Sequence, residues 1–149
     1  MKARYTHTNL VARDWRRLAA FYQDVFGCEP VPPGRDLSGS WLDRGTGIPG
    51  VRVRGVHLRL PGHGDSGPTL EIFTYEPALD GPTPAPNRAG LGHIAFEVDD
   101  VSAACDALLE AGGRLLGEVV THEVPGRGTL SFVYGADPEG NIIELQRWR

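Results

Sequence analysis

Hydrophobic and polar residues follow two regular patterns along the chain, and these patterns predict a mixture of strands and helices. Alternation of apolar and polar residues predicts strands at residues 4–11, 51–60, 69–75, 92–98 and 142–146, and further strands near 116–124 and 129–134. Apolar residues at helical spacing follow Asp14 and again follow Asp100, and an aspartate favours a helix N-terminus. Glycines at 27 and 112–113 close these runs, so each predicted helix has a start and a stop.

Three segments are less regular. Residues 28–50 are rich in Pro, Gly and Ser, which predicts a short strand and a long loop around Trp41. The alternation within residues 51–60 changes phase near Gly55, which predicts a β-bulge there. Four prolines fall within residues 77–90 and predict a linker.

The predicted elements occur twice in the same order, strand, helix and then about three strands. His7 and His93 each lie seven residues before the aspartate that caps the following helix, and twenty before the glycine that ends it. The repeat defines one module at about residues 4–76 and a second at about 91–149, joined by the linker at 77–90. We therefore expect a single α+β domain of two βαβββ modules, forming a curved mixed sheet around a central metal cleft.

Each module ends with an acidic residue inside an apolar strand. Glu71 lies in Leu-Glu-Ile and Glu144 in Ile-Glu-Leu, 64 and 51 residues after the corresponding histidine, so the first module carries about thirteen extra residues, which we place in the 28–50 loop. Side chains alternate along a strand, so a glutamate between two core residues points away from the core and needs a polar partner. Two imidazoles and two carboxylates at equivalent positions, pointing off the helix-covered face, predict a divalent-metal site of nitrogen and oxygen ligands.

Five motifs in order resemble the vicinal oxygen chelate superfamily, which includes glyoxalase I, methylmalonyl-CoA epimerase, extradiol dioxygenases and bleomycin and fosfomycin resistance proteins. These motifs are Tyr5-Thr-His-Thr-Asn-Leu-Val, the Phe21-Tyr22…Phe26-Gly27 helix end, Leu70-Glu71-Ile72, Gly92-His93-Ile94-Ala95-Phe96, and Asp137-Pro138-Glu139-Gly140-Asn141…Glu144. The resemblance implies one divalent ion (Zn, Ni, Co, Mn or Fe) held by His7, Glu71, His93 and Glu144. It also implies that Glu144, with Glu71 as the symmetric candidate, acts as a general base in a lyase or epimerase.

The expected substrate is a small 2-oxo, thiohemiacetal or acyl-thioester compound. Two alternatives stay open: an Fe(II) extradiol-type dioxygenase using His7, His93 and Glu144, and a metal-free protein that binds an aromatic drug. His57 and His122 are candidates for contacts around the site, whereas His63 lies in a turn and is expected to be solvated. The arginines at 52, 54 and 59 indicate a solvated sheet face or, as a minority interpretation, a site for an acidic substrate tail.

Size and charge restrict the classes of partner. A chain of 149 residues fits one domain, and its net charge of −4 argues against binding nucleic acid through released counterions. No apolar run is long enough for a membrane span and no signal-peptide core is present, so we expect a cytoplasmic protein with no membrane partner. Cys28 and Cys105 lack metal-like spacing and are expected to be free thiols. The resemblance implies a homodimer.

Overall fold

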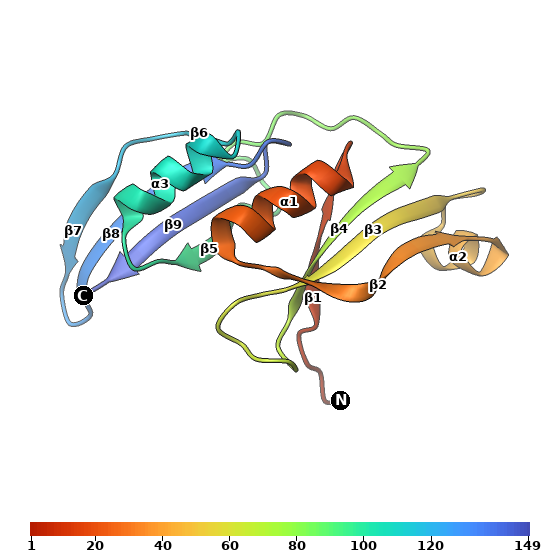
Figure 1. Cartoon of the computed structure of the whole chain (residues 1–149), viewed down its shortest axis with the longest axis horizontal. Helices are drawn as coiled ribbons and strands as arrows, with labels where there is room; N and C mark the ends of the chain where they lie inside the picture. The colour runs from red at the N-terminus through yellow and green to blue at the C-terminus, as the bar shows by residue number, and fades with distance from the viewer. The chain divides into compact units, whose positions relative to one another are not determined.

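The structure is a computed structural model that describes residues 1–149 in two units, Met1–Gly81 and Pro82–Arg149. Each unit has its own sheet of mixed strand orientation with a helix on one face, and the chain has three helices in all (Figure 1). These elements confirm the predicted α+β class. The boundary between the units falls in the proline-rich segment 77–90, which contains no helix or strand.

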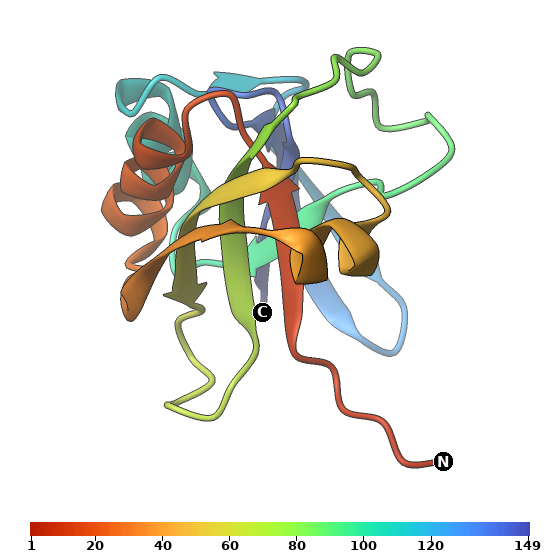
Figure 2. The ribbon, with the colours of Figure 1, turned by 90° about the vertical axis from the view of Figure 1, so that its right-hand side faces the viewer.

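The first unit forms a four-stranded sheet in the order β1-β4-β3-β2. Its elements are β1 (His7–Val11), α1 (Trp15–Phe26), β2 (Glu29–Ser38), α2 (Ser40–Thr46), β3 (Arg52–Arg59) and β4 (Thr69–Glu76). The first and last strands, β1 and β4, are parallel neighbours, and the other pairs are antiparallel. In Figure 2, α1 lies along one face of this sheet.

The second unit repeats this arrangement in a sheet with the order β5-β9-β8-β6, in which β7 also pairs with β8. Its elements are β5 (Ile94–Glu97), α3 (Val101–Glu110), β6 (Arg114–Leu115), β7 (Val120–Val124), β8 (Gly128–Ala136) and β9 (Ile142–Trp148). Here too the first and last strands, β5 and β9, are parallel neighbours. The two short strands β6 and β7 take the place of β2.

The strand register confirms the internal repeat residue by residue. Glu71 on β4 is paired with Asn9 on β1, and Glu144 on β9 is paired with Ala95 on β5. Each of these partners lies two residues beyond the histidine that opens its module. The two acids therefore occupy the same position relative to the two histidines.

The two helices that the sequence predicts, α1 and α3, begin at the predicted caps and end at or next to the predicted glycines. The carboxylate of Asp14 accepts hydrogen bonds from the backbone N–H groups of Arg16 and Arg17, and Gly27 ends α1 with a left-handed conformation (φ 67°). Asp100 caps α3 in the same way through Ser102 and Ala103. These caps satisfy backbone donors that a helix leaves unpaired at its start.

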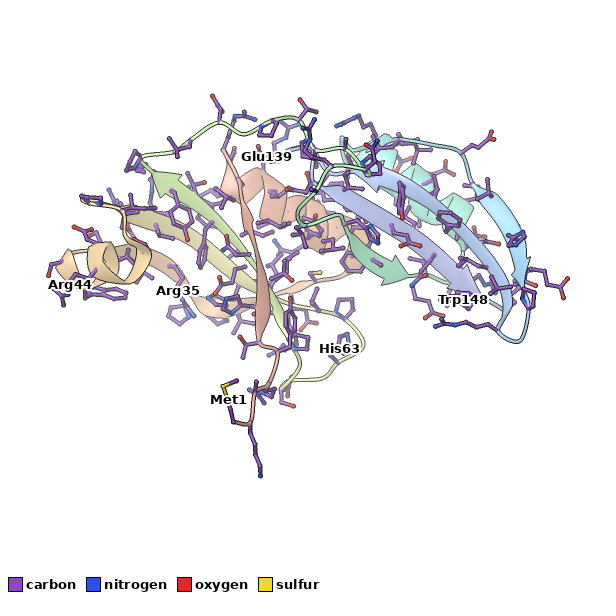
Figure 3. The ribbon with its side chains drawn as sticks, turned by 180° about the vertical axis from the view of Figure 1, so that it is seen from behind. Met1, Arg35, Arg44, His63, Glu139 and Trp148 are labelled. Carbon is purple, nitrogen blue, oxygen red and sulfur yellow. The ribbon has the colours of Figure 1, made fainter.

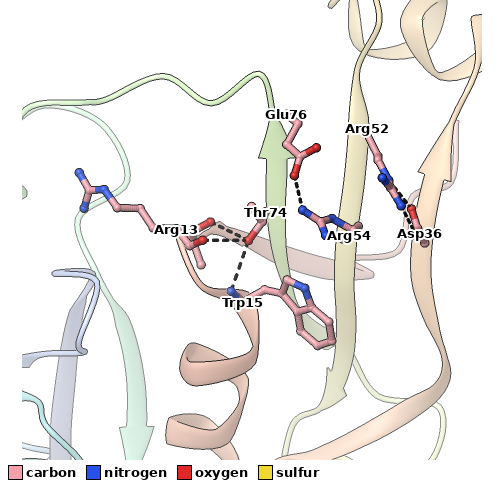
Figure 4. A network of polar contacts seen from close by, with 8 residues as sticks. Arg13, Trp15, Asp36, Arg52, Arg54, Thr74 and Glu76 are labelled. Atoms are coloured by element: carbon pink, nitrogen blue, oxygen red, sulfur yellow. Dashed lines mark hydrogen bonds and ion pairs between the residues drawn. The ribbon is translucent and has the colours of Figure 1, made fainter.

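Burial of one face of each sheet by its helix sets the direction of the acidic side chains. Leu70 and Ile72 on β4 are buried, and Thr74, on the same face, accepts a hydrogen bond from the Trp15 N–H at the start of α1 and donates one to the carbonyl of Ala12 (Figure 4). Since side chains alternate, Glu71 points to the opposite face. In the second unit Ile143 and Leu145 are fully buried, and Glu144 between them points away from α3.

The prediction of a β-bulge at Gly55 is wrong, because the pairing of β3 with β4 is regular from Arg52 to Arg59. The alternation of apolar and polar residues along β3 changes phase because the face of the strand that is buried changes. Val56 and Leu58 are buried on the α1 face, whereas Val53 is buried on the other face, in a cluster with Val51 and Phe73 to which the α2 region contributes Leu42 and Ile48. The register irregularity of this sheet lies instead in β2, between Val31 and Arg35.

The segment 28–50 also differs from the prediction. It forms a ten-residue strand, β2, and a short helix, α2, in place of a short strand and a long loop. The extra residues of the first module are divided between two places. The connection from α1 to β3 (27–51) is longer than the corresponding connection from α3 to β8 (111–127). The β3–β4 turn (60–68) is also longer than the β8–β9 turn (137–141).

No helix in the structure combines the length and the apolar character needed to cross a lipid bilayer.

Candidate metal and acid–base site

Glu71 is a largely buried carboxylate in the middle of β4, on the face that α1 leaves uncovered. It is 8% exposed, and only one other charged residue, Asp137, is buried. Its neighbour across the antiparallel pairing is His57 on β3, and its neighbour across the parallel pairing is Asn9 on β1. The strand register thus places one polar side chain on either side of the acid.

Both carboxylate oxygens of Glu71 have nitrogen partners. His57 Nε2 lies 3.0 Å from Oε1, Asn9 Nδ2 donates to Oε2 at 3.1 Å, and His7 Nε2 lies 3.4 Å from the same Oε2. A buried carboxylate is stable only when its oxygens are paired, and these three side chains meet that need. The predicted pair of His7 and Glu71 is therefore present, within a cluster larger than predicted.

The surroundings of His57 favour its neutral form. Burial lowers the pKa of His57 below its ordinary value, Arg35 and His7 act in the same direction, and the carboxylate of Glu71 opposes them. A neutral imidazole has one N–H, and an ionised carboxylate can only accept, so we assign the hydrogen to Nε2. Nδ1 is then free to accept from the hydroxyl of Thr69, 3.4 Å away.

The second unit brings together the other predicted pair. His93 Nε2 lies 3.0 Å from Glu144 Oε2, and the side chain of Glu144 is 15% exposed. Tyr134, which is paired with Glu144 across β8 and β9, places its ring 5.0 Å from the imidazole of His93. Tyr134 makes no hydrogen bond to Glu144, so His93 is the carboxylate's one polar partner.

The two pairs have the donor spacing that a divalent ion requires. Two ligand atoms bound to one ion at about 2.0–2.2 Å, in tetrahedral or octahedral geometry, lie roughly 2.8–3.6 Å apart. The nitrogen–oxygen distances of 3.4 Å (His7 and Glu71) and 3.0 Å (His93 and Glu144) fall in this range. Imidazole nitrogen with carboxylate oxygen also suits Zn, Mn, Fe, Co or Ni, so the residues present fit the implied metal.

Neither pair is a complete site by itself. No group of three or more His, Cys, Asp or Glu side chains in the structure is arranged to hold a metal ion.

The remaining candidates have other surroundings. His63 is exposed on the turn between β3 and β4, as expected of a solvated residue (Figure 3), and His122 is exposed on β7. The three arginines of β3 form ion pairs at the surface. Arg52 pairs with Asp36 (2.7 Å) and Arg54 with Glu76 (Figure 4). Arg59 pairs with Glu29 (3.1 Å). They are neutralised by acidic neighbours, which agrees with a solvated sheet face.

Asn9 and Tyr134 contribute to these clusters but were not predicted. Strand alternation already puts Asn9 on the face of His7, and that signal is enough to propose it as a contact. For Tyr134 the signal is weaker, because its distance from Glu144 depends on the β8–β9 register, which the sequence alone does not set.

Comparison with known proteins agrees with the fold. The family model of the Glyoxalase/Bleomycin resistance protein/Dioxygenase superfamily matches residues 4–145. The chain therefore belongs to this superfamily, which confirms the resemblance seen in the motifs.

Two curated relatives extend over almost the whole chain. A probable lactoylglutathione lyase from Vibrio parahaemolyticus is 31% identical over 144 residues, which is 95% of this chain and 88% of the relative. An ethylmalonyl-CoA/methylmalonyl-CoA epimerase from Cereibacter sphaeroides is 26% identical over 151 residues, 99% of each chain. Both are enzymes by name, which confirms the prediction of a glyoxalase- or epimerase-like enzyme.

Solved structures share the fold. A glyoxalase family protein from Bacillus cereus has a TM-score of 0.78 with 20% identity, covering 99% of this chain and 94% of its own. The fosfomycin resistance protein FosX from Listeria monocytogenes, solved with Mn(II) and sulfate, has a TM-score of 0.58 with 15% identity, covering 100% and 95%. A divalent metal is therefore found in at least one protein of this fold.

Proposed function

We propose that this protein is a divalent-metal-dependent lyase or isomerase that moves a proton on the carbon next to a substrate carbonyl. The observation that carries the proposal is the repeated pair: each unit joins one imidazole to one largely buried carboxylate at equivalent register positions.

His7, Glu71, His93 and Glu144 are the proposed metal ligands. A divalent ion bound there supplies Lewis acidity, which polarises the substrate carbonyl and stabilises the negative charge left when the neighbouring C–H loses its proton. The chain's own contribution is to hold these side chains in place: β4 and β9 present the carboxylates from the middle of buried strands, and the helix-covered face keeps those strands rigid.

Glu144 is the proposed general base. The carboxylate of Glu144 has a single polar partner, His93, whereas that of Glu71 has three. Glu144 would therefore leave the proposed metal ion more easily than Glu71. Glu144 takes the proton from the substrate carbon and becomes a carboxylic acid. It then returns the proton to an adjacent carbon in an isomerase-type lyase, or the same carbon is reprotonated in an epimerase.

The names of two relatives support the proposed substrate class. A thiohemiacetal of glutathione is the first candidate, because the relative with the higher identity over nearly the full chain is named a lactoylglutathione lyase. An acyl-CoA thioester is the second, because the named epimerase aligns over 99% of both chains. In both, a carbonyl or its equivalent lies beside an acidic C–H.

Proton exchange in heavy water tests this function directly. The metal-loaded protein is incubated in D2O with the methylglyoxal–glutathione adduct or with methylmalonyl-CoA, and deuterium on the substrate carbon is followed by NMR. We expect incorporation with one of the two substrates, lost on chelation, and reduced by about 10²–10⁴-fold in Glu144→Gln, which cannot accept the proton. Oxygen uptake with a catechol by the Fe(II)-loaded protein, without exchange, would contradict the proposal and favour the dioxygenase alternative.

A further inference from the structure

We propose that His57 is a positioning residue that fixes the carboxylate of Glu71 as a metal ligand. This inference rests on the proposed function, because it assigns a role to a neighbour of a proposed ligand. The contact that supports this inference joins His57 Nε2 and Glu71 Oε1, which lie 3.0 Å apart.

The two carboxylate oxygens of Glu71 have different partners. Oε1 faces His57, and Oε2 faces His7 at 3.4 Å and Asn9 at 3.1 Å. Whatever the charge on His57, the nitrogen facing an ionised carboxylate must carry a hydrogen, so His57 donates to Oε1. This leaves Oε2 as the oxygen beside the proposed ligand His7, and fixes the rotation of the carboxylate about its last bond.

The ring of His57 is itself held in position. Thr69, at the start of β4, places its hydroxyl 3.4 Å from Nδ1, and the ring of Phe73 meets the imidazole edge to face with centroids 5.6 Å apart. Side chains that hydrogen-bond a metal ligand orient it and typically change metal affinity 10–100-fold when removed. His57 meets the structural requirement for such a role.

The second module lacks this contact at the equivalent position. His57 is paired with Glu71 across β3 and β4 as Tyr134 is paired with Glu144 across β8 and β9, but Tyr134 makes no hydrogen bond to its acid. Asn9 likewise corresponds to Ala95, which has no polar side chain. The two modules thus divide the roles: Glu71 is fixed as a ligand, and Glu144 keeps the freedom that a base requires.

Metal affinity of three variants tests this role. Mn(II) binding is measured by calorimetry and by EPR of the free ion for wild type, His57→Leu, His57→Gln and the exposed control His122→Leu. We expect His57→Leu to lower affinity by about 10–100-fold. His57→Gln, whose amide can donate to Oε1, recovers most of it, and His122→Leu matches wild type. Equal affinity of His57→Leu and wild type would overturn the proposal.

A second measurement on metal-free protein keeps the inference separate from the proposed function. Thermal midpoints of His57→Leu, Glu71→Gln and the double variant form a cycle that reports their coupling. We expect non-additive shifts, because either single change already breaks the contact; additive shifts would overturn the positioning role. A wild type that binds no metal, together with non-additive shifts, would refute the proposed function and also the ligand-positioning role, leaving a structural contact.

Discussion

Glu71 and Glu144 hold the same position in two copies of one motif, yet their surroundings differ. Three side chains contact the carboxylate of Glu71, and one contacts that of Glu144. The difference originates in two residue choices, His57 and Asn9 in the first module against Tyr134 and Ala95 in the second. Under the proposed function, the duplicated pair would in this way supply one fixed ligand and one base.

The buried thiol of Cys28 leads to a prediction on pH dependence. Burial raises the pKa of Cys28 from 9.0 to about 11, so the folded protein keeps its proton where the unfolded chain releases it. The resulting stability is fully present below the unfolded value of 9.0 and is lost as the pH rises towards about 11.

We therefore expect the loss of stability between these two pH values to be shallower in Cys28→Ala than in wild type, as measured by urea unfolding at successive pH values. Native Cys28 should also resist iodoacetamide at about pH 8 and react once the protein is unfolded. Equal slopes for the two proteins, or rapid native labelling of Cys28, would show that the thiol is not buried as described.

At the scale of elements, Gly55 marks the point on β3 where the buried side of the strand changes. A Cβ added to Gly55 would lie 2.0 Å from the carbonyl oxygen of Ile72 and 2.5 Å from the ring of Phe73. The absence of a side chain at Gly55 allows Phe73 to pack over the strand, within the cluster of Val51, Val53 and Phe73 that the α2 region covers.

Gly55→Ala should destabilise the protein by about 1–3 kcal/mol, because backbone and ring must both shift. Gly45→Ala is the matched control: Gly45 lies in helix α2 with nothing within 4 Å of its added Cβ, and alanine there should stabilise by about 0.5–1 kcal/mol. Chemical denaturation measures both. Unchanged stability in Gly55→Ala would argue against the close packing of Phe73 on β3.

Helices and strands with strong local signals were predictable, and those that depend on tertiary contacts were not. Asp14, Gly27 and Asp100 carry capping chemistry that fixes α1 and α3 from sequence alone. The α2 helix carries no such signal: its N-cap is Gly39, which makes no side-chain hydrogen bond, and none of its residues is buried. The phase change at Gly55 was visible in the pattern of apolar and polar residues. Its cause is that α1 covers one face of the strand and the α2 region covers the other, and this depends on tertiary packing.

At the scale of the whole molecule, the duplication was predictable because spacing is a property of sequence. The intervals from His7 and His93 to the helix caps led to the module assignment. In the structure, Asn9 is paired with Glu71 and Ala95 with Glu144, at equivalent positions. The contact of His57 with Glu71 could be suspected but not assigned, because it depends on the β3–β4 register. The four-ligand set and the homodimer remain predictions.

The central claim is the proposal that His7, Glu71, His93 and Glu144 are ligands of one metal ion. Titration of metal-free protein with Mn(II) tests it most directly, comparing wild type with His7→Ala and His93→Ala. We predict one ion per chain in wild type, and loss of that ion in either variant. Two ions in wild type, with one lost in each variant, would show that the pairs bind metal independently and would contradict the account; no binding in wild type would contradict it as well.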